Sequence, residues 1–292
     1  MIRLAVRVRR EQAELVLAEL LELAPSGVEE VAAGDSVEYA VYGAPGELPS
    51  LPDLKAAAGG ALVEIATSET PDDWCERWRR FHKPVLIAAQ APARDARRAV
   101  PALYVRPPWE PPTRLPAGEV QEIVIEPAQA FGTGAHATTR QCLELLVCLA
   151  AQRPELGTLV DLGTGSGVLA IAAARLGFRP VVAIDNEQDS VAAARANAAA
   201  NGVQLDLRHA DGLAYAASWP HAREAVLVAN LLRPTLLELA RTMPTAPRDL
   251  LVGGLLAEQA DEAATAFREQ LGLRQRAFRE GAGWVALWLS PS

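Results

Sequence analysis

The chain has 292 residues, half of them apolar and 22% charged, and its formal net charge is −8. This length and apolar content exclude a largely disordered chain and allow one large domain or two ordinary ones. The negative charge excludes a broad, non-specific grip on nucleic acid and would attract a basic protein substrate.

Neither a membrane span nor a secretory signal is expected. No apolar run approaches the ~20 residues of a spanning helix, and Met1-Ile2-Arg3-Leu4 leads into alternating strand-like residues. The three cysteines lack the close spacing of zinc ligands, which favours buried, reduced thiols and no metal site. We therefore expect a cytoplasmic protein without membrane contact.

Residues 1–70 alternate between strand-like and helical patterns, and Gly34-Asp35 separates the two middle strands. The order βαββαβ predicts a ferredoxin-like α+β domain, a common platform for binding another macromolecule. The expected strands are 4–9, 28–32, 37–42 and 61–67, and the expected helices are 11–23 and 51–58.

Residues 71–83 are predicted to form a helix that links this domain to the next. Trp74, Trp78 and Phe81 recur at helical spacing, which favours an aromatic packing face over a ligand-stacking role. Strands at 84–88 and 103–106 follow. The proline-rich stretch 107–112 is interpreted as a stiff surface loop between strands, with a polyproline docking site as the alternative.

Residues 84–292 are predicted to form the second domain, an α/β fold. Strands and helices alternate from Thr158 onward, which predicts a mostly parallel, Rossmann-like sheet. Only a glycine-containing turn separates the final two strands, 276–278 and 284–289, so we expect an antiparallel hairpin at the sheet edge.

A glycine-rich turn at 161–167 ends one predicted strand and opens an alanine-rich helix, and Asp185 ends the next strand. Gly163, Gly165 and Gly167 allow a sharp turn and a close ligand, and an acid in the place of Asp185 can hold both ribose hydroxyls. Val168 fills the place of the third glycine of dinucleotide-binding motifs, which disfavours a pyrophosphate and a nicotinamide dehydrogenase. A turn without any ligand is the alternative. The pattern resembles that of class I S-adenosylmethionine methyltransferases.

Three other places carry candidate ligand groups. The loop containing Phe131 and Gly134 leads to Thr138 and Thr139 at a helix start, where hydroxyls and free N–H groups suit the carboxylate of the cofactor's methionine half or simply cap the helix. Asp211 follows the strand at 205–208 and is placed like an acid that accepts a hydrogen bond from adenine. These residues extend the predicted cofactor site beyond the glycine-rich turn.

The strings F-G-T-G-x-H-x-T-T, D-x-G-x-G-S-G and Val228-Ala229-Asn230-Leu231-Leu232 resemble the bacterial ribosomal protein L11 methyltransferase (PrmA) family, and the resemblance covers nearly the whole chain. It implies an N-terminal domain that recognises L11, free or ribosome-bound, a linker helix, and an S-adenosylmethionine-dependent methyltransferase domain. It also implies cofactor contacts at Thr139, Gly163, Asp185 and Asn230.

This chain departs from the family pattern at several places. Glu126-Pro127-Ala128 stands where the family usually has Asp-Pro-Gly, and Thr164 stands where cysteine is common. Arg233-Pro234-Thr235 replaces small residues close to where the acceptor must enter. The identity of the acceptor is therefore less firmly implied than that of the cofactor.

The chemistry predicted is methyl transfer to an amine, catalysed chiefly by aligning two reactants. Asn230 is the candidate catalytic residue because its amide oxygen can orient an amine without acting as a nucleophile, although it could merely cap a strand end. The alternatives are a methyltransferase acting on another protein, one acting on a nucleic acid base, and a non-catalytic cofactor-binding module. The base is disfavoured because no N-P-P-aromatic motif stands at Asn230.

Overall fold

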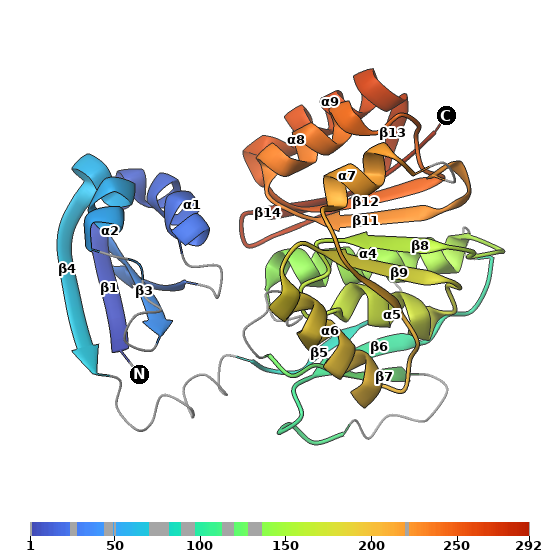
Figure 1. The fold of residues 1–292 in the computed structure, drawn as a ribbon, viewed down its shortest axis with the longest axis horizontal. Helices are drawn as coiled ribbons and strands as arrows, with labels where there is room; N and C mark the ends of the chain where they lie inside the picture. Colours follow the sequence, from blue (N-terminus) through green and yellow to red (C-terminus); the bar gives the residue numbers. More distant parts are fainter. Residues whose placement is uncertain are drawn as a thin grey trace. The chain divides into compact units, whose positions relative to one another are not determined.

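The computed structural model describes residues 2–23, 28–43, 49, 51–69, 82–88, 97–112, 120–127, 136–219 and 222–291. The chain divides into two compact units, Met1–Phe81 and His82–Ser292, which are described separately below (Figure 1). Residues 71–81 of the predicted linker helix, and with them its three aromatic residues, lie outside the described residues.

The first unit has the predicted βαββαβ order. A four-stranded sheet has the order β2-β3-β1-β4 with every neighbouring pair antiparallel. Leu4, Val6 and Val8 of β1 share a core with Val16 and Leu20 of α1 because alternate residues of a strand face the same side. The elements are β1 (Ile2–Arg9), α1 (Ala13–Leu23), β2 (Glu29–Ala33), β3 (Ser36–Gly43), α2 (Leu51–Ala58) and β4 (Leu62–Glu69).

The intervening residues of the same strands carry charges. Glu38 of β3 accepts hydrogen bonds from Arg3 at 2.6 Å and from Arg7 at 2.8 Å, and Arg7 also reaches Glu64 of β4 at 2.9 Å. The hydrogen bonds from Arg3 and Arg7 lower the pKa of Glu38. The apolar face of the sheet sets the register of the strands, and these cross-strand ion pairs reinforce it.

The second unit is built on a seven-stranded sheet with the order β10-β9-β8-β11-β12-β14-β13. Strands β8 to β12 are parallel, β14 runs antiparallel to β12, and β13 pairs with β14 as an edge hairpin, which confirms both predictions. The strands are β8 (Leu159–Leu162), β9 (Val181–Asp185), β10 (Asp206–His209), β11 (Val226–Asn230), β12 (Asp249–Leu256), β13 (Leu273–Gly281) and β14 (Trp284–Pro291).

Helices cover both faces of this sheet (Figure 1). On one face α4 (Ala137–Gln152), α5 (Val168–Leu176) and α6 (Gln188–Ala200) contribute to one core. On the other, α7 (Gly212–Ala217), α8 (Arg233–Thr242) and α9 (Ala260–Leu271) contribute to a second. Sequence analysis did not predict the short helix α7.

A small second sheet lies beyond α4 and α5. It consists of β5 (Val85–Ile87), β6 (Ala102–Arg106) and β7 (Val120–Val124), and sequence analysis missed β7. Ile87, Leu103 and Ile123 from the three strands join the core formed by α4 and α5. Helix α4 is therefore packed between two sheets, which explains why its sequence is apolar nearly all round.

The proline-rich stretch 107–112 follows β6 and contains neither helix nor strand, which agrees with the predicted loop, although the next described strand, β7, was not predicted. The Arg106 guanidinium donates to the carbonyl oxygens of Pro107 at 3.2 Å and Glu110 at 2.8 Å, so one cation fixes the turn. Among the described helices, none is both long enough and apolar enough to cross a membrane.

Candidate functional site

The predicted site residues gather where the carboxyl ends of four parallel strands meet. Leu162 of β8 pairs with Ile184 of β9 on one side and with Ala229 of β11 on the other, and Asp185 pairs with His209 of β10. Segments that follow these strands therefore lie side by side. In open α/β sheets this edge is where ligands bind.

The glycine-rich turn after β8 needs its glycines for reasons of its own backbone. Gly163, Gly165 and Gly167 have φ of +68°, +53° and +82°, in the left-handed region that favours glycine. A Cβ on Gly163 would overlap the side chain of Leu231, and a Cβ on Gly167 would lie 3.0 Å from that of Ala194. The backbone conformation therefore favours glycine at all three positions, and close packing against Ala194 adds to this at Gly167, in addition to the ligand approach expected from the sequence.

Asp185 joins this turn to the end of β9. Its Oδ2 accepts from the Gly165 N–H at 2.8 Å, and its Oδ1 accepts from the Glu187 N–H at 3.0 Å. The side chain is nearly buried, at 7% exposure. An ionised carboxylate has about four acceptor positions, so each oxygen keeps capacity for a further donor such as a hydroxyl.

Thr138, Thr139 and Asn230 meet between the start of α4 and the end of β11. The Asn230 Nδ2 donates to the hydroxyl oxygens of Thr138 at 3.4 Å and Thr139 at 3.5 Å. Both threonines are buried, and the Asn230 Oδ1 is a buried acceptor with no partner among the described residues. The structure thus brings three predicted site residues together and leaves one amide oxygen available.

His136 caps helix α4. Its Nδ1 accepts from the Thr138 N–H at 3.4 Å and lies 3.0 Å from the Thr138 hydroxyl, while the ring packs edge-on against Trp284 with centroids 5.2 Å apart. Burial lowers the pKa of His136, which keeps the ring neutral near pH 7 and its Nδ1 able to accept. These contacts give His136 a structural role at the start of α4.

Asp161, the first residue of the glycine-rich motif, is a site group to which sequence analysis gave no role. It is fully buried; its Oδ2 accepts from the Thr164 hydroxyl at 2.7 Å, and its Oδ1 has no partner within the described part of the chain. Desolvation, with a smaller contribution from the charge of Asp185, raises the pKa of Asp161 to about 7, although hydrogen bonds from the Thr164 hydroxyl and the Ala170 N–H act in the opposite direction. A buried, unsatisfied carboxylate oxygen is costly unless a ligand donates to it.

Gly253 and Gly254 of β12 let that strand approach Asn230 closely. A Cβ on Gly253 would overlap the Cys142 thiol and lie 2.7 Å from the Asn230 Oδ1, and a Cβ on Gly254, where φ is +81°, would overlap the Leu231 carbonyl oxygen. The Leu231 N–H donates to the Gly253 carbonyl at 3.2 Å. The two glycines therefore fix where the Asn230 side chain can lie.

For the remaining predicted residues, the structure gives less evidence about a role in cofactor binding. Asp211 is exposed and caps α7, with its Oδ1 accepting from the N–H groups of Leu213 at 2.8 Å and Ala214 at 3.2 Å. Its contact with adenine stays a prediction. Phe131 and Gly134 lie outside the described residues.

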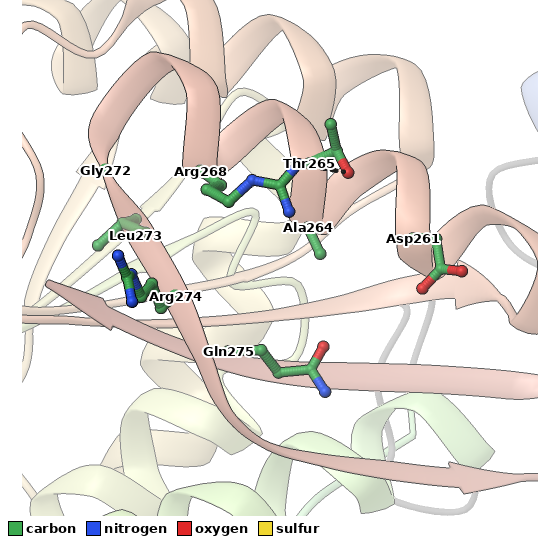
Figure 2. A pocket seen from close by; sticks show the side chains of 8 residues that line it. All are labelled: Asp261, Ala264, Thr265, Arg268, Gly272, Leu273, Arg274 and Gln275. Carbon is green, nitrogen blue, oxygen red and sulfur yellow. Dashed lines mark hydrogen bonds between the residues drawn. The ribbon is translucent and has the colours of Figure 1, made fainter. Parts of the chain in front are cut away.

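A shallow hollow lies elsewhere, between α9 and the start of β13 (Figure 2). Its lining includes the guanidinium groups of Arg268 and Arg274 and the side chain of Asp261, and it contains none of the polar groups described above. The candidate site is placed at the strand ends because Asp161 and Asn230 each have a buried oxygen there without a partner among the described residues, whereas none of the residues lining the hollow has such an atom.

The strand order, the antiparallel β14, the glycine-rich turn after β8 and the acid ending β9 together define the class I methyltransferase fold. The family model described as "Ribosomal protein L11 methyltransferase (PrmA)" matches residues 56–290. The chain therefore belongs to the ribosomal protein L11 methyltransferase (PrmA) family.

Individual relatives agree with this assignment. The ribosomal protein L11 methyltransferase of Geobacter sulfurreducens is 36% identical over 214 residues, which span 72% of this chain and 64% of that protein. The protein of the same name from Burkholderia ambifaria is 30% identical, with 97% of this chain and 96% of that protein covered. A crystal structure of ribosomal protein L11 methylase from Lactobacillus delbrueckii subsp. bulgaricus is 28% identical, has a TM-score of 0.55, and covers 65% of this chain and 95% of that one.

We expect Gly254→Ala to destabilise the second unit by about 3 kcal/mol, because the new methyl group combines left-handed strain with overlap of the Leu231 carbonyl. Gly272→Ala is the matched control, since its φ is +68° but no atom lies within 4 Å of the added Cβ. It should cost only about 1 kcal/mol. Urea unfolding of both variants measures the difference, and equal losses would contradict the close approach of Gly254 to Leu231.

Proposed function

We propose that the protein transfers methyl groups from S-adenosylmethionine to amino groups of ribosomal protein L11, on lysine side chains and the N-terminal amine. The observation that carries this proposal is the family match over residues 56–290, together with the polar groups at the ends of β8, β9 and β11.

The chemistry of these groups fits the proposed cofactor. The Asp161 Oδ1 is a buried acceptor without a partner among the described residues, and once the carboxyl ionises, with its pKa of about 7, it suits the ammonium group of the methionine half. Asp185 suits the two ribose hydroxyls. When bound, S-adenosylmethionine supplies a methyl group on a positively charged sulfur, and a nearby carboxylate favours that charge.

The residues of the chain would act by positioning and by excluding water. Thr138 and Thr139 hold the amide nitrogen of Asn230, so its Oδ1 can accept an N–H of the acceptor amine and orient the nitrogen lone pair. A lysine must first lose its proton, since its ordinary pKa is about 10.4, and burial at this site lowers that pKa. Cys142 is no nucleophile, because burial raises the pKa of its thiol.

The first unit is suited to recognise a basic partner. Residues 1–69 contain twelve Asp and Glu against five Lys and Arg, so this unit holds nearly all of the chain's net charge of −8. Such a field attracts a basic protein surface and steers its approach. We therefore assign L11 recognition to residues 1–70, joined through a linker at 71–83 to the methyltransferase domain at 84–292.

The direct test incubates the full chain with purified L11 and methyl-labelled S-adenosylmethionine. Wild-type protein should label L11, and mass spectrometry should place the methyl groups on amines. Asn230→Ala should reduce the rate about a hundredfold, because the acceptor amine loses its orienting group. Absence of label in L11, or label in other ribosomal components alone, would contradict the proposal.

Asp185→Ala should weaken S-adenosylmethionine binding by about 1–3 kcal/mol, the cost of losing hydrogen bonds to a charged group. Calorimetry measures the change. Asp206→Ala serves as control, because that acid lies on β10, is exposed and pairs only with Arg208 among the described residues. Unchanged affinity in Asp185→Ala would refute the ribose assignment.

Binding should also depend on pH through Asp161. Its folded pKa is raised to about 7, so the carboxyl is protonated at lower pH and becomes anionic only as pH rises through that value. A cationic ligand should therefore bind about tenfold more weakly at pH 5.5 than at pH 7. Asp161→Asn should remove this dependence, and an equal pH slope in wild type and variant would count against the role of Asp161.

A further inference from the structure

Asn197 of α6 connects the glycine-rich turn to the chain just after β7. Its Nδ2 donates to the Ser166 carbonyl at 2.9 Å, and its Oδ1 accepts from the Glu126 N–H at 2.9 Å. The side chain is 3% exposed. Nothing in the proposed chemistry uses Asn197, yet its amide is satisfied on both sides by backbone groups far apart in sequence.

The Ser166 bond fixes one peptide plane of the turn. On the opposite side of the same peptide, the Gly167 N–H donates to the Thr164 carbonyl at 2.8 Å. Gly167 also packs against Ala194, which lies one helical turn before Asn197 on α6. The peptide between Ser166 and Gly167 is therefore held by hydrogen bonds on both sides. It belongs to the same turn as Gly165, whose N–H donates to Asp185.

Asn201, one turn further along α6, offers a natural comparison. Its Oδ1 accepts from the Val124 N–H at 2.8 Å, and its Nδ2 donates to the Val124 carbonyl at 2.7 Å and to the Asn197 carbonyl at 2.8 Å. Like Asn197, it is buried and attaches α6 to β7. None of these three side-chain bonds reaches the glycine-rich turn.

We propose that Asn197 is a positioning residue for cofactor binding: its amide N–H groups hold the Ser166 carbonyl so that the glycine-rich turn keeps the shape in which Gly165 meets Asp185. This inference rests on the proposed function, because the turn binds the cofactor only if that function is correct. Asn201 contributes to stability alone.

The experiment compares Asn197→Asp with Asn201→Asp in the full chain. Each change keeps the side-chain shape and one acceptor and introduces a buried carboxylate, on α6 or at its C-cap; it removes one donated hydrogen bond at Asn197 and two at Asn201. Calorimetry gives the Kd for S-adenosylmethionine, methylation of L11 gives KM and kcat, and thermal unfolding gives Tm.

Asn197→Asp should raise the Kd and KM for S-adenosylmethionine about tenfold, the effect of losing one well-placed hydrogen bond, with kcat at saturating cofactor within about twofold of wild type. Asn201→Asp should lower Tm at least as much, because it removes two donated hydrogen bonds, and leave the Kd within about twofold of wild type. The pair Asn197→Ala and Asn201→Ala repeats the comparison without a buried charge, should an aspartate variant fail to fold.

Wild-type affinity in Asn197→Asp, or equal weakening in both variants of a pair, would overturn the inference alone. Absence of S-adenosylmethionine binding by the wild-type chain would instead overturn the proposed function, and the inference with it.

Discussion

The hydrogen bond from the Gly165 N–H to the Asp185 carboxylate is the contact on which the candidate site depends. It joins the turn after one central strand to the end of its neighbour, and it can form only because the turn follows a left-handed path that side chains oppose. The carboxylate that fixes the turn is also the one proposed to hold the ribose hydroxyls. Chain geometry and ligand recognition therefore make demands on the same few atoms.

Burial determines how strongly the polar groups near this contact can bind a ligand. Helix α4 lies between two sheets, and Thr138, Thr139 and Asp161, at its start and at the end of β8, are buried, as is the Oδ1 atom of the partly exposed Asn230. A low dielectric raises the cost of every unsatisfied acceptor and the strength of any bond that satisfies it. The Oδ1 atoms of Asp161 and Asn230 have no partner among the described residues and can each accept a hydrogen bond from a ligand. Leaving them unsatisfied costs stability, which the large core offsets.

The sequence allowed the alternating fold, the terminal hairpin, the glycine-rich turn, Asp185 and the start of α4 to be predicted, because each has a local pattern. Strand β7 was missed because its stability comes from parallel pairing with β6 and from α6, which lies some seventy positions away. Asp161 could be recognised in the sequence as part of the glycine-rich motif. Only the packed structure shows that its Oδ1 is buried without a partner among the described residues. Asn197 looks like any polar residue of an alanine-rich helix until α6 is docked.

The Asn201 amide also has a consequence for how the small sheet ends. By donating to the Val124 carbonyl and accepting from its N–H, it occupies the groups that an outer strand would otherwise seek. An open strand border invites pairing with a foreign chain and, from there, aggregation. Here a single side chain takes the place of a neighbouring strand at the last residue of β7, which shortens the border that another chain could pair with.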